Sequence, residues 1–251
     1  MPYQMTVSPD FTPNHISSWY IFNTWLQKSL NEDIHLELYD GFEQQRAAVH
    51  ADQVDLIFAN PYDAAMLVRK KGFLPIAKPT RASDEAIIVV HKDNPAQQVE
   101  DLNTGISIAA TDDPDVNLIC QIMLEPAELN TNNTQQVTKN TYPLVAKALI
   151  QHTVDLGFFL AEAYESLSKI TRRELRPLVS SQIQVIHHAL LAGPKLHQKR
   201  DSMRDLLIGM AQDAKGAGVL RTLGIEAWEL MNDEEMEFMI DLMDTLNYQP
   251  A

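Results

Sequence analysis

The sequence has one cysteine, Cys120, and no long run of apolar residues. A single cysteine cannot form an internal disulfide bond, and Cys120 has no cysteine or histidine nearby at metal-ligand spacing. We therefore predict a buried structural thiol, because a free cysteine behaves as a small hydrophobic residue. No segment approaches the roughly 20 consecutive apolar residues of a membrane helix, so we expect no insertion into a membrane.

Basic side chains are also few, since 20 lysines and arginines stand against 34 aspartates and glutamates. The formal net charge of -14 repels nucleic acid, and nucleic-acid binding is therefore excluded. Residues 1–7 lack the basic and apolar regions of a secretory signal. As written, the sequence predicts a cytoplasmic protein; a periplasmic protein whose leader had been removed would look the same.

Motifs of catalysis are missing as well. With nine glycines the chain has no phosphate-cradling loop, and it has neither a nucleophile elbow nor a zinc motif. Of the eight histidines, only His187 and His188 are adjacent, on a predicted strand where successive side chains point to opposite faces. We expect one core and one surface histidine there, no metal, no cofactor and no enzymatic activity.

What the chain does contain is an alternation of short apolar runs and amphipathic stretches, the pattern of βαβ units in a mostly parallel sheet. Asn60-Pro61 ends one strand and begins a helix, because proline fits the first helical turn. The pattern predicts strands at 5–8, 34–38, 54–59, 73–77, 106–110, 136–138 and 156–159, with helices at 16–30, 43–51, 60–68, 116–124 and 143–151.

Two longer apolar runs, 86–90 and 185–191, are interpreted as strands that cross between two lobes. Lobe I then consists of residues 1–82 and 188–251, and lobe II of residues 83–187. Helices are predicted at 196–210, 215–223 and 233–246. The last of these is acidic and rich in methionine. This composition favours a surface helix whose methionines pack inward; the alternative is a groove that binds a partner.

Two segments share one order of features, a helix, a loop and then a strand that begins with valine and aspartate: residues 42–59 and 142–159. This order resembles the phosphonate-binding type of periplasmic solute-binding protein, and the similarity extends over most of the chain. Further matches are the opening Val7-Ser8-Pro9-Asp10, the run 91–95 and the turn Asp113-Pro114 before a helix.

The resemblance implies a two-lobed α/β fold of the type II periplasmic-binding-protein kind, in which each lobe is a mixed sheet flanked by helices. In that family the ligand lies in the cleft between the lobes, and hinge motion closes the cleft. A membrane transporter or another protein would be the partner. The ligand-binding residues that it implies are Ser8, Asp10, Phe42, Asn60, Tyr62, Asp84, Asp115, Val116, Asn117, Tyr142, Glu162 and His187.

The sequence departs from the family at several of these positions. Phe42 and Asp84 stand where the family usually has tyrosines, and Tyr142 stands where it commonly has a histidine. Residues 115–119 replace a serine-threonine-serine-glycine run that holds the phosphonate oxygens. A carboxylate that can meet a ligand amine is retained at Glu162.

The departures place Asp112, Asp113 and Asp115 at the start of a helix, where carboxylates cap free N–H groups and complement the helix dipole. The protein would supply its own anion, so we predict weak binding of phosphate and simple phosphonates. Two alternatives remain open: a pocket for a neutral or amine-bearing ligand with an apolar part, or a site that has lost its ligand. A cytoplasmic ligand sensor and an enzyme on the same fold are the other functional alternatives.

Overall fold

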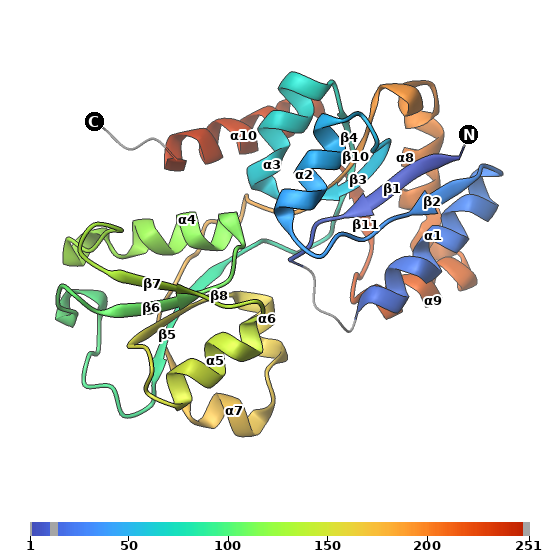
Figure 1. Cartoon of the computed structure of the whole chain (residues 1–251). Helices are drawn as coiled ribbons and strands as arrows, with labels where there is room; N and C mark the ends of the chain where they lie inside the picture. The colour runs from blue at the N-terminus through green and yellow to red at the C-terminus, as the bar shows by residue number, and fades with distance from the viewer. Residues whose placement is uncertain (1, 11–14, 248–251) are drawn as a thin grey trace. The chain divides into compact units, whose positions relative to one another are not determined.

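The computed structural model describes residues 2–10 and 15–247, and its contacts divide the chain into two compact units. Unit 1 comprises Met1–Ala82 and His187–Met243; unit 2 comprises Ser83–Ile186 and Asp244–Ala251. Each unit is a mixed sheet flanked by helices, as the sequence predicts (Figure 1). Within the described residues the predicted division differs in two places, since it puts residue 187 in the second lobe and residues 244–247 in the first.

Unit 1 contains a six-stranded sheet with the order β11-β4-β10-β3-β1-β2. Strand β1 pairs in parallel with β2 and β3, whereas β10 is antiparallel to both β3 and β4. The parallel half is where the alternation of strand and helix begins, and the carboxyl ends of β1 and β3 therefore lie at the same sheet edge. The strands are β1 Tyr3–Val7, β2 Ile34–Leu36, β3 Leu56–Ala59, β4 Leu74–Pro79, β10 Ala189–Ala192 and β11 Trp228–Leu230.

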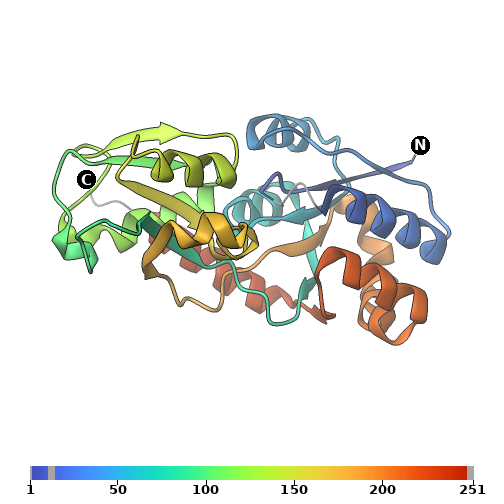
Figure 2. The ribbon, with the colours of Figure 1, turned by 90° about the horizontal axis from the view of Figure 1, so that it is seen from below.

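Helices cover both faces of this sheet. One hydrophobic core joins α1, α8 and α9 to the sheet through Trp19, Phe22 and Leu220, and these helices gather on the same side of it (Figures 1 and 2). A second core joins α2, α3 and α10 to the other face, where Leu67 and Met239 are fully buried. The helices are α1 Ile16–Leu30, α2 Phe42–His50, α3 Pro61–Ala65, α8 Arg200–Gly209, α9 Ala214–Leu223 and α10 Asp233–Asn247.

Unit 2 contains a five-stranded sheet with the order β7-β6-β8-β5-β9. Strands β6, β7 and β8 run parallel, and β5 is antiparallel to β8 and β9. Helix α4 packs on β5 and β8, while α5 and α6 share a core with the sheet around Val145 and Phe159. The elements are β5 Ala86–His91, β6 Ser107–Ala110, α4 Pro114–Met123, β7 Gln135–Thr138, α5 Tyr142–Ile150, β8 Leu156–Leu160, α6 Ala161–Ser166, α7 Lys169–Arg173 and β9 Leu175–Ser180.

The repeated valine-aspartate motif has the same structural role in both units. Asp55 accepts the backbone N–H of Gln4 at 3.0 Å, and Asp155 accepts that of Ser107 at 2.8 Å. Each aspartate therefore satisfies a backbone donor of the neighbouring parallel strand just before its own strand begins. The motif therefore helps to hold β3 beside β1 in unit 1 and β8 beside β6 in unit 2.

The prediction that the apolar run 86–90 crosses between lobes is wrong, whereas the run 185–191 does contain a passage between the two units. Strand β5 lies wholly in the unit 2 sheet between β8 and β9, and β10 lies in the unit 1 sheet between β3 and β4. The runs are apolar because an inner strand covered on both faces buries every side chain. The chain passes between units at 82/83, 186/187 and 243/244, outside both strands. The prediction also missed β9, β11 and the short helices α6 and α7.

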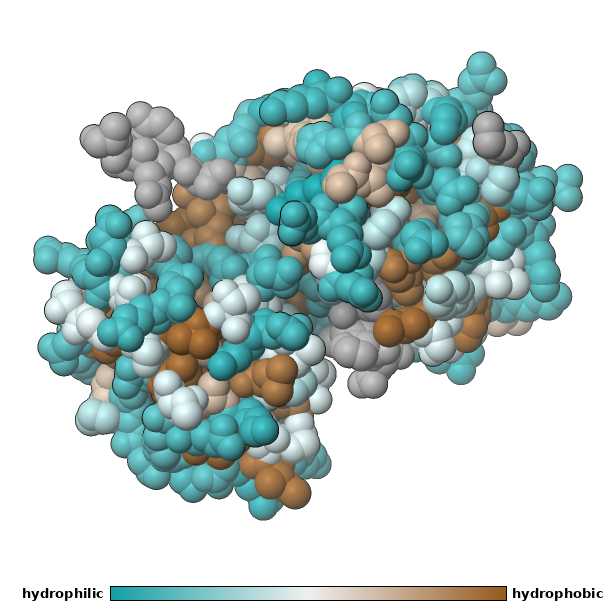
Figure 3. All heavy atoms as spheres, in the orientation of Figure 1, coloured by the Kyte–Doolittle hydropathy of each residue, from teal (hydrophilic) through white to brown (hydrophobic). Residues whose placement is uncertain are grey.

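The predictions for Cys120 and for the methionines of helix α10 are confirmed. Cys120 is buried, and this burial, followed by the nearby charge of Asp113, raises the pKa of its thiol well above the ordinary value. Helix α10 buries Met236 and Met239, whereas its acidic residues are exposed or partly exposed. On the face seen in Figure 3 the apolar residues form small areas separated by hydrophilic ones. None of the helices in the described part of the chain has the length and hydropathy of a membrane span.

Candidate functional site

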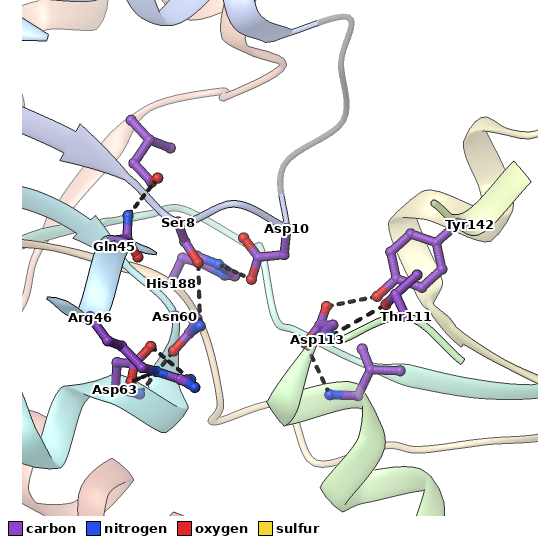
Figure 4. A network of polar contacts seen from close by, with 12 residues as sticks. Ser8, Asp10, Gln45, Arg46, Asn60, Asp63, Thr111, Asp113, Tyr142 and His188 are labelled. Atoms are coloured by element: carbon purple, nitrogen blue, oxygen red, sulfur yellow. Dashed lines mark hydrogen bonds and ion pairs between the residues drawn. The ribbon is translucent and has the colours of Figure 1, made fainter. Parts of the chain in front are cut away.

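In unit 1 the predicted residues Ser8 and Asn60 lie together where β1 and β3 end. The Asn60 side chain donates from Nδ2 to the Ser8 hydroxyl at 3.3 Å, and its Oδ1 accepts the backbone N–H of Asp63 at 2.8 Å (Figure 4). Asn60 is thereby the N-cap of α3, with Pro61 in the first turn. Both side chains are buried, so their hydrogen bonds hold them in place at this edge of the sheet.

Asp10 follows β1 and pairs with His188. The distance between His188 Nε2 and Asp10 Oδ2 is 2.9 Å, and the two side chains are only 13% and 3% exposed. The imidazole also stacks on the ring of Phe58, with centroids 5.2 Å apart. The prediction of one core and one surface histidine is wrong, because His187 is buried as well. Both histidines precede β10, so strand alternation does not apply to them.

Predicted residue His187 belongs to a different cluster in unit 1. Its Nε2 lies 3.2 Å from Nζ of Lys78, which also forms an ion pair with Glu235 and lies 3.3 Å from Glu229. These partners come from β4, β11 and α10. A basic group held between two carboxylates is typical of a structural network, since a buried charge needs paired neighbours.

The predicted ligand-binding residues Phe42 and Tyr62 contact a cation of the protein itself. The guanidinium carbon of Arg46 lies 5.3 Å from the Phe42 ring centroid and 5.4 Å from that of Tyr62. The same guanidinium donates to the Asp63 carboxylate from Nε at 2.7 Å and from Nη2 at 3.1 Å. Because Phe42 is also buried, these rings form a cation-π cluster around Arg46.

In unit 2 the centre of the candidate site is Asp113, the N-cap of α4. Its Oδ1 accepts the backbone N–H of Val116 at 3.2 Å, and its Oδ2 accepts the hydroxyl of Tyr142 at 2.7 Å (Figure 4). Asp113 is 3% exposed. The same carboxylate thus binds both predicted residues, Val116 and Tyr142. It already accepts one of the backbone N–H groups that would otherwise be free at this helix terminus.

Asn117 and Asp115 complete the first turns of α4. The Asn117 side chain donates to the carbonyl of Thr111 at 2.9 Å, and the hydroxyl of Thr111 accepts the backbone N–H of Asp113 at 3.4 Å. Asp115 is buried in the first turn. Glu162 lies in the first turn of α6, and Asp84 precedes β5, where its backbone N–H donates to the carbonyl of Ile186.

Sequence reasoning missed several polar residues of unit 1. Arg46 follows Phe42 by four positions on α2, a spacing that brings side chains together on a helix. Gln45 is buried and donates from Nε2 to the carbonyl of Val7 at 2.8 Å and to the hydroxyl of Thr6 at 3.2 Å. The helical spacing was a usable signal for Arg46, whereas Gln45 needed knowledge of the neighbouring strand.

The two mixed sheets with flanking helices, and polar clusters at strand and helix termini, define a protein of the periplasmic-binding class. A family model described as "ABC transporter, phosphonate, periplasmic substrate-binding protein" matches residues 5–236. The chain belongs to this family of substrate-binding proteins. The recognition of the family and its fold from sequence is therefore confirmed.

Solved structures of low identity share the fold. PhnD1 of Prochlorococcus marinus in complex with methylphosphonate is 10% identical, with a TM-score of 0.82 and coverage of 98% of both chains. The binding component of an ABC phosphonate transporter from Pseudomonas aeruginosa is 16% identical, with a TM-score of 0.75, over 100% of this chain and 90% of that one. The aliphatic sulphonate binding protein of Escherichia coli is 16% identical, with a TM-score of 0.66, over 98% and 91%. No curated protein matches the sequence.

Proposed function

We propose that this substrate-binding protein serves an ABC importer whose ligand is neither phosphate nor a simple phosphonate. The observation that carries the proposal is the position of Asp113. Its carboxylate accepts an N–H of α4 and the hydroxyl of Tyr142, two donors that an oxyanion at this helix terminus would need. The protein therefore satisfies these donors with a negative charge of its own.

The magnitude of the repulsion supports this proposal. A phosphonate of charge near -2 at about 4 Å from one carboxylate meets repulsion of several kcal/mol at an effective dielectric near 20. Micromolar affinity corresponds to about 8 kcal/mol, so one such contact removes much of it. Asp115 lies buried in the same helical turn and adds a second carboxylate.

The ligand class that fits unit 2 is a neutral or amine-bearing molecule. Carboxylates at Asp84, Asp115 and Glu162 favour a protonated amine over an anion. Phe42 and Tyr62 support this less than their sequence positions suggested, because Arg46 already lies against both rings. Recognition of the amine is therefore assigned to the carboxylates of unit 2.

Family membership supports a periplasmic location and a membrane transporter as partner. The matching model describes periplasmic substrate-binding proteins of ABC transporters, which are binding proteins and not enzymes. We accordingly favour the periplasmic alternative for this chain over the cytoplasmic one, and transport over sensing or catalysis.

Calorimetric titration tests the proposal directly. Methylphosphonate and phosphate are expected to bind with dissociation constants weaker than about 100 μM, and a thermal-shift screen of small amines and neutral metabolites is expected to give a stabilising ligand. A ligand at about 100 times its dissociation constant stabilises the folded state by about 2.7 kcal/mol. Submicromolar binding of either anion would refute the proposal.

Variants then locate the ligand. Asp84→Asn and Glu162→Gln each remove one charge and should weaken an amine ligand found in the screen, while Glu100→Gln, an exposed residue of the same unit, should not. If no ligand from a broad screen stabilises the protein, the result supports the alternative in which the site has lost its ligand and Asp113 and its neighbours are only helix caps.

A further inference from the structure

A hollow in unit 1 lies beside the edge strand of the sheet, away from the cluster of Ser8 and Asn60. It has a volume of about 510 Å³ and runs between helix α1 and strand β2, lined by Tyr20, Asn23, Thr24, Gln27 and residues 33–37. Strand β2 is the outermost strand of the sheet, so its outer edge has no neighbouring strand. The volume falls within the range of about 300 to 1,000 Å³ that is usual for small-molecule sites.

Two amide side chains of α1 take the place of the missing strand. Asn23 donates from Nδ2 to the carbonyl of Ile34 at 3.0 Å, and Oε1 of Gln27 accepts the N–H of Ile34 at 3.3 Å. The oxygen of the Asn23 amide, unlike its nitrogen, has no such bond within the described part of the chain. Asn23 is 6% exposed, and its Oδ1 is buried without a hydrogen-bond partner among the described residues.

A buried acceptor without a donor is unfavourable, and native structures normally supply the donor or a water molecule. Turning the Asn23 amide over does not help, because Oδ1 would then face the carbonyl of Ile34. The described residues supply no donor to Oδ1, and Asn23 is one of the residues that line the hollow, so we assign the donor to a molecule bound there.

The electrostatics of the hollow select the kind of donor. Among the described residues that line it there is no lysine or arginine, whereas Asp33 and Glu37 are acidic. His35 forms an exposed pair with Glu37 at 3.2 Å. The ring of Tyr20 is half exposed at 49% and offers an aromatic face to a cation. The carboxylates and the aromatic face together favour a cationic ligand with several hydrogen-bond donors.

The distance between the two carboxylates, Asp33 and Glu37, indicates the length of the ligand. Asp33 and Glu37 flank β2, and both remain in its ladder, because the N–H of Tyr3 bonds to Asp33 and the N–H of Glu37 bonds to Met5. At about 3.3 Å per residue, four residues place the two carboxylates on the order of 13 Å apart. We propose that this hollow binds a linear aliphatic polyamine, with an ammonium group at each carboxylate and a donor toward Asn23.

Isothermal titration with spermidine at low ionic strength and pH 7.5 tests the proposal. Wild-type protein should show one saturable event, and Asp33→Asn with Glu37→Gln should weaken it by about five- to tenfold, the effect of two exposed ion pairs. Tyr20→Leu should weaken it as well. The matched control is Glu100→Gln with Glu128→Gln, which removes the same charge from exposed positions of unit 2 and should change the affinity less than twofold.

Hydrogen exchange locates the site independently, because bound spermidine should protect the amides of residues 34–37. Absence of saturable heat, or equal losses in the test and control pairs, would overturn the proposal. Binding that survives Asp33→Asn with Glu37→Gln but is lost in Asp113→Asn with Asp115→Asn would also overturn it, and would instead support amine binding in unit 2. The two proposals therefore fail separately.

Discussion

Neutralising Asp113 should convert this protein into a better phosphonate binder. In Asp113→Asn the Oδ1 atom can still accept the N–H of Val116, and asparagine is as good an N-cap as aspartate. The Tyr142 hydroxyl can rotate to accept from the new amide. The substitution therefore removes one negative charge while it leaves the helix terminus nearly as stable as before.

The gain in affinity follows from Coulomb's law. An anion that accepts a neighbouring N–H of the same turn would lie about 6 Å from the carboxylate, where two negative charges on the ligand meet about 5 to 6 kcal/mol of repulsion at an effective dielectric near 20. If solvent screens half of this, about 3 kcal/mol remains, which corresponds to roughly 100-fold in the dissociation constant.

Titration calorimetry with methylphosphonate measures the change. Asp112→Asn is the matched control, because it alters the same charge one residue earlier at an exposed position outside the cap. We expect about 100-fold tighter binding for Asp113→Asn and less than fivefold for the control. Equal gains would show that only the overall charge matters, and no gain in either variant would refute the assignment of Asp113 as the obstacle.

Three further predictions concern stability and reactivity. Tyr142→Phe removes the donor to the buried Asp113 carboxylate and should lower the free energy of unfolding by about 1 to 3 kcal/mol in urea titration; an unchanged midpoint would contradict the hydrogen bond. Burial acts to raise the pKa of Glu85, but bonds from Ser181 and the N–H groups of residues 183–184 outweigh it and hold the pKa below the ordinary 4.5. Because the folded pKa is the lower one, this stabilisation is present above about pH 4.5 and disappears as the pH falls through the folded value. Glu85→Gln should therefore be less stable than the wild type at pH 6, and the difference should shrink as the pH falls below 4.5; a difference that stays constant with pH would argue against it. Cys120 should react with a thiol reagent only after unfolding, since burial and the raised pKa suppress the thiolate; rapid labelling of the native protein would contradict its placement.

Periodicity predicted most of the secondary structure because each element has a local signal. The helix at 16–30 and the strands that begin after Val54 and Val154 are found where the sequence predicts them, within a few residues. Short elements such as β11, with three residues, carry too little periodicity to be recognised. The apolar run at 86–90 was misassigned because burial on both faces and passage between lobes leave the same apolar signature.

The candidate site was only partly predictable. The sequence placed carboxylates at the start of α4, and the cap that Asp113 forms there is a local contact within three residues. The bond from Tyr142 to Asp113 and the pair of His188 with Asp10 join residues 29 and 178 positions apart. Contacts at such separations depend on how the strands are ordered.

The sequence by itself determined the family, the two-lobed α/β class, the acidic charge and the helix caps, because each depends on composition or on neighbours a few residues away. Tertiary structure alone decided that Arg46 occupies the faces of Phe42 and Tyr62 and that Asn23 keeps a buried acceptor beside β2. These outcomes depend on the packing of distant segments, which sets the partner of each side chain and the polar groups that remain for a ligand.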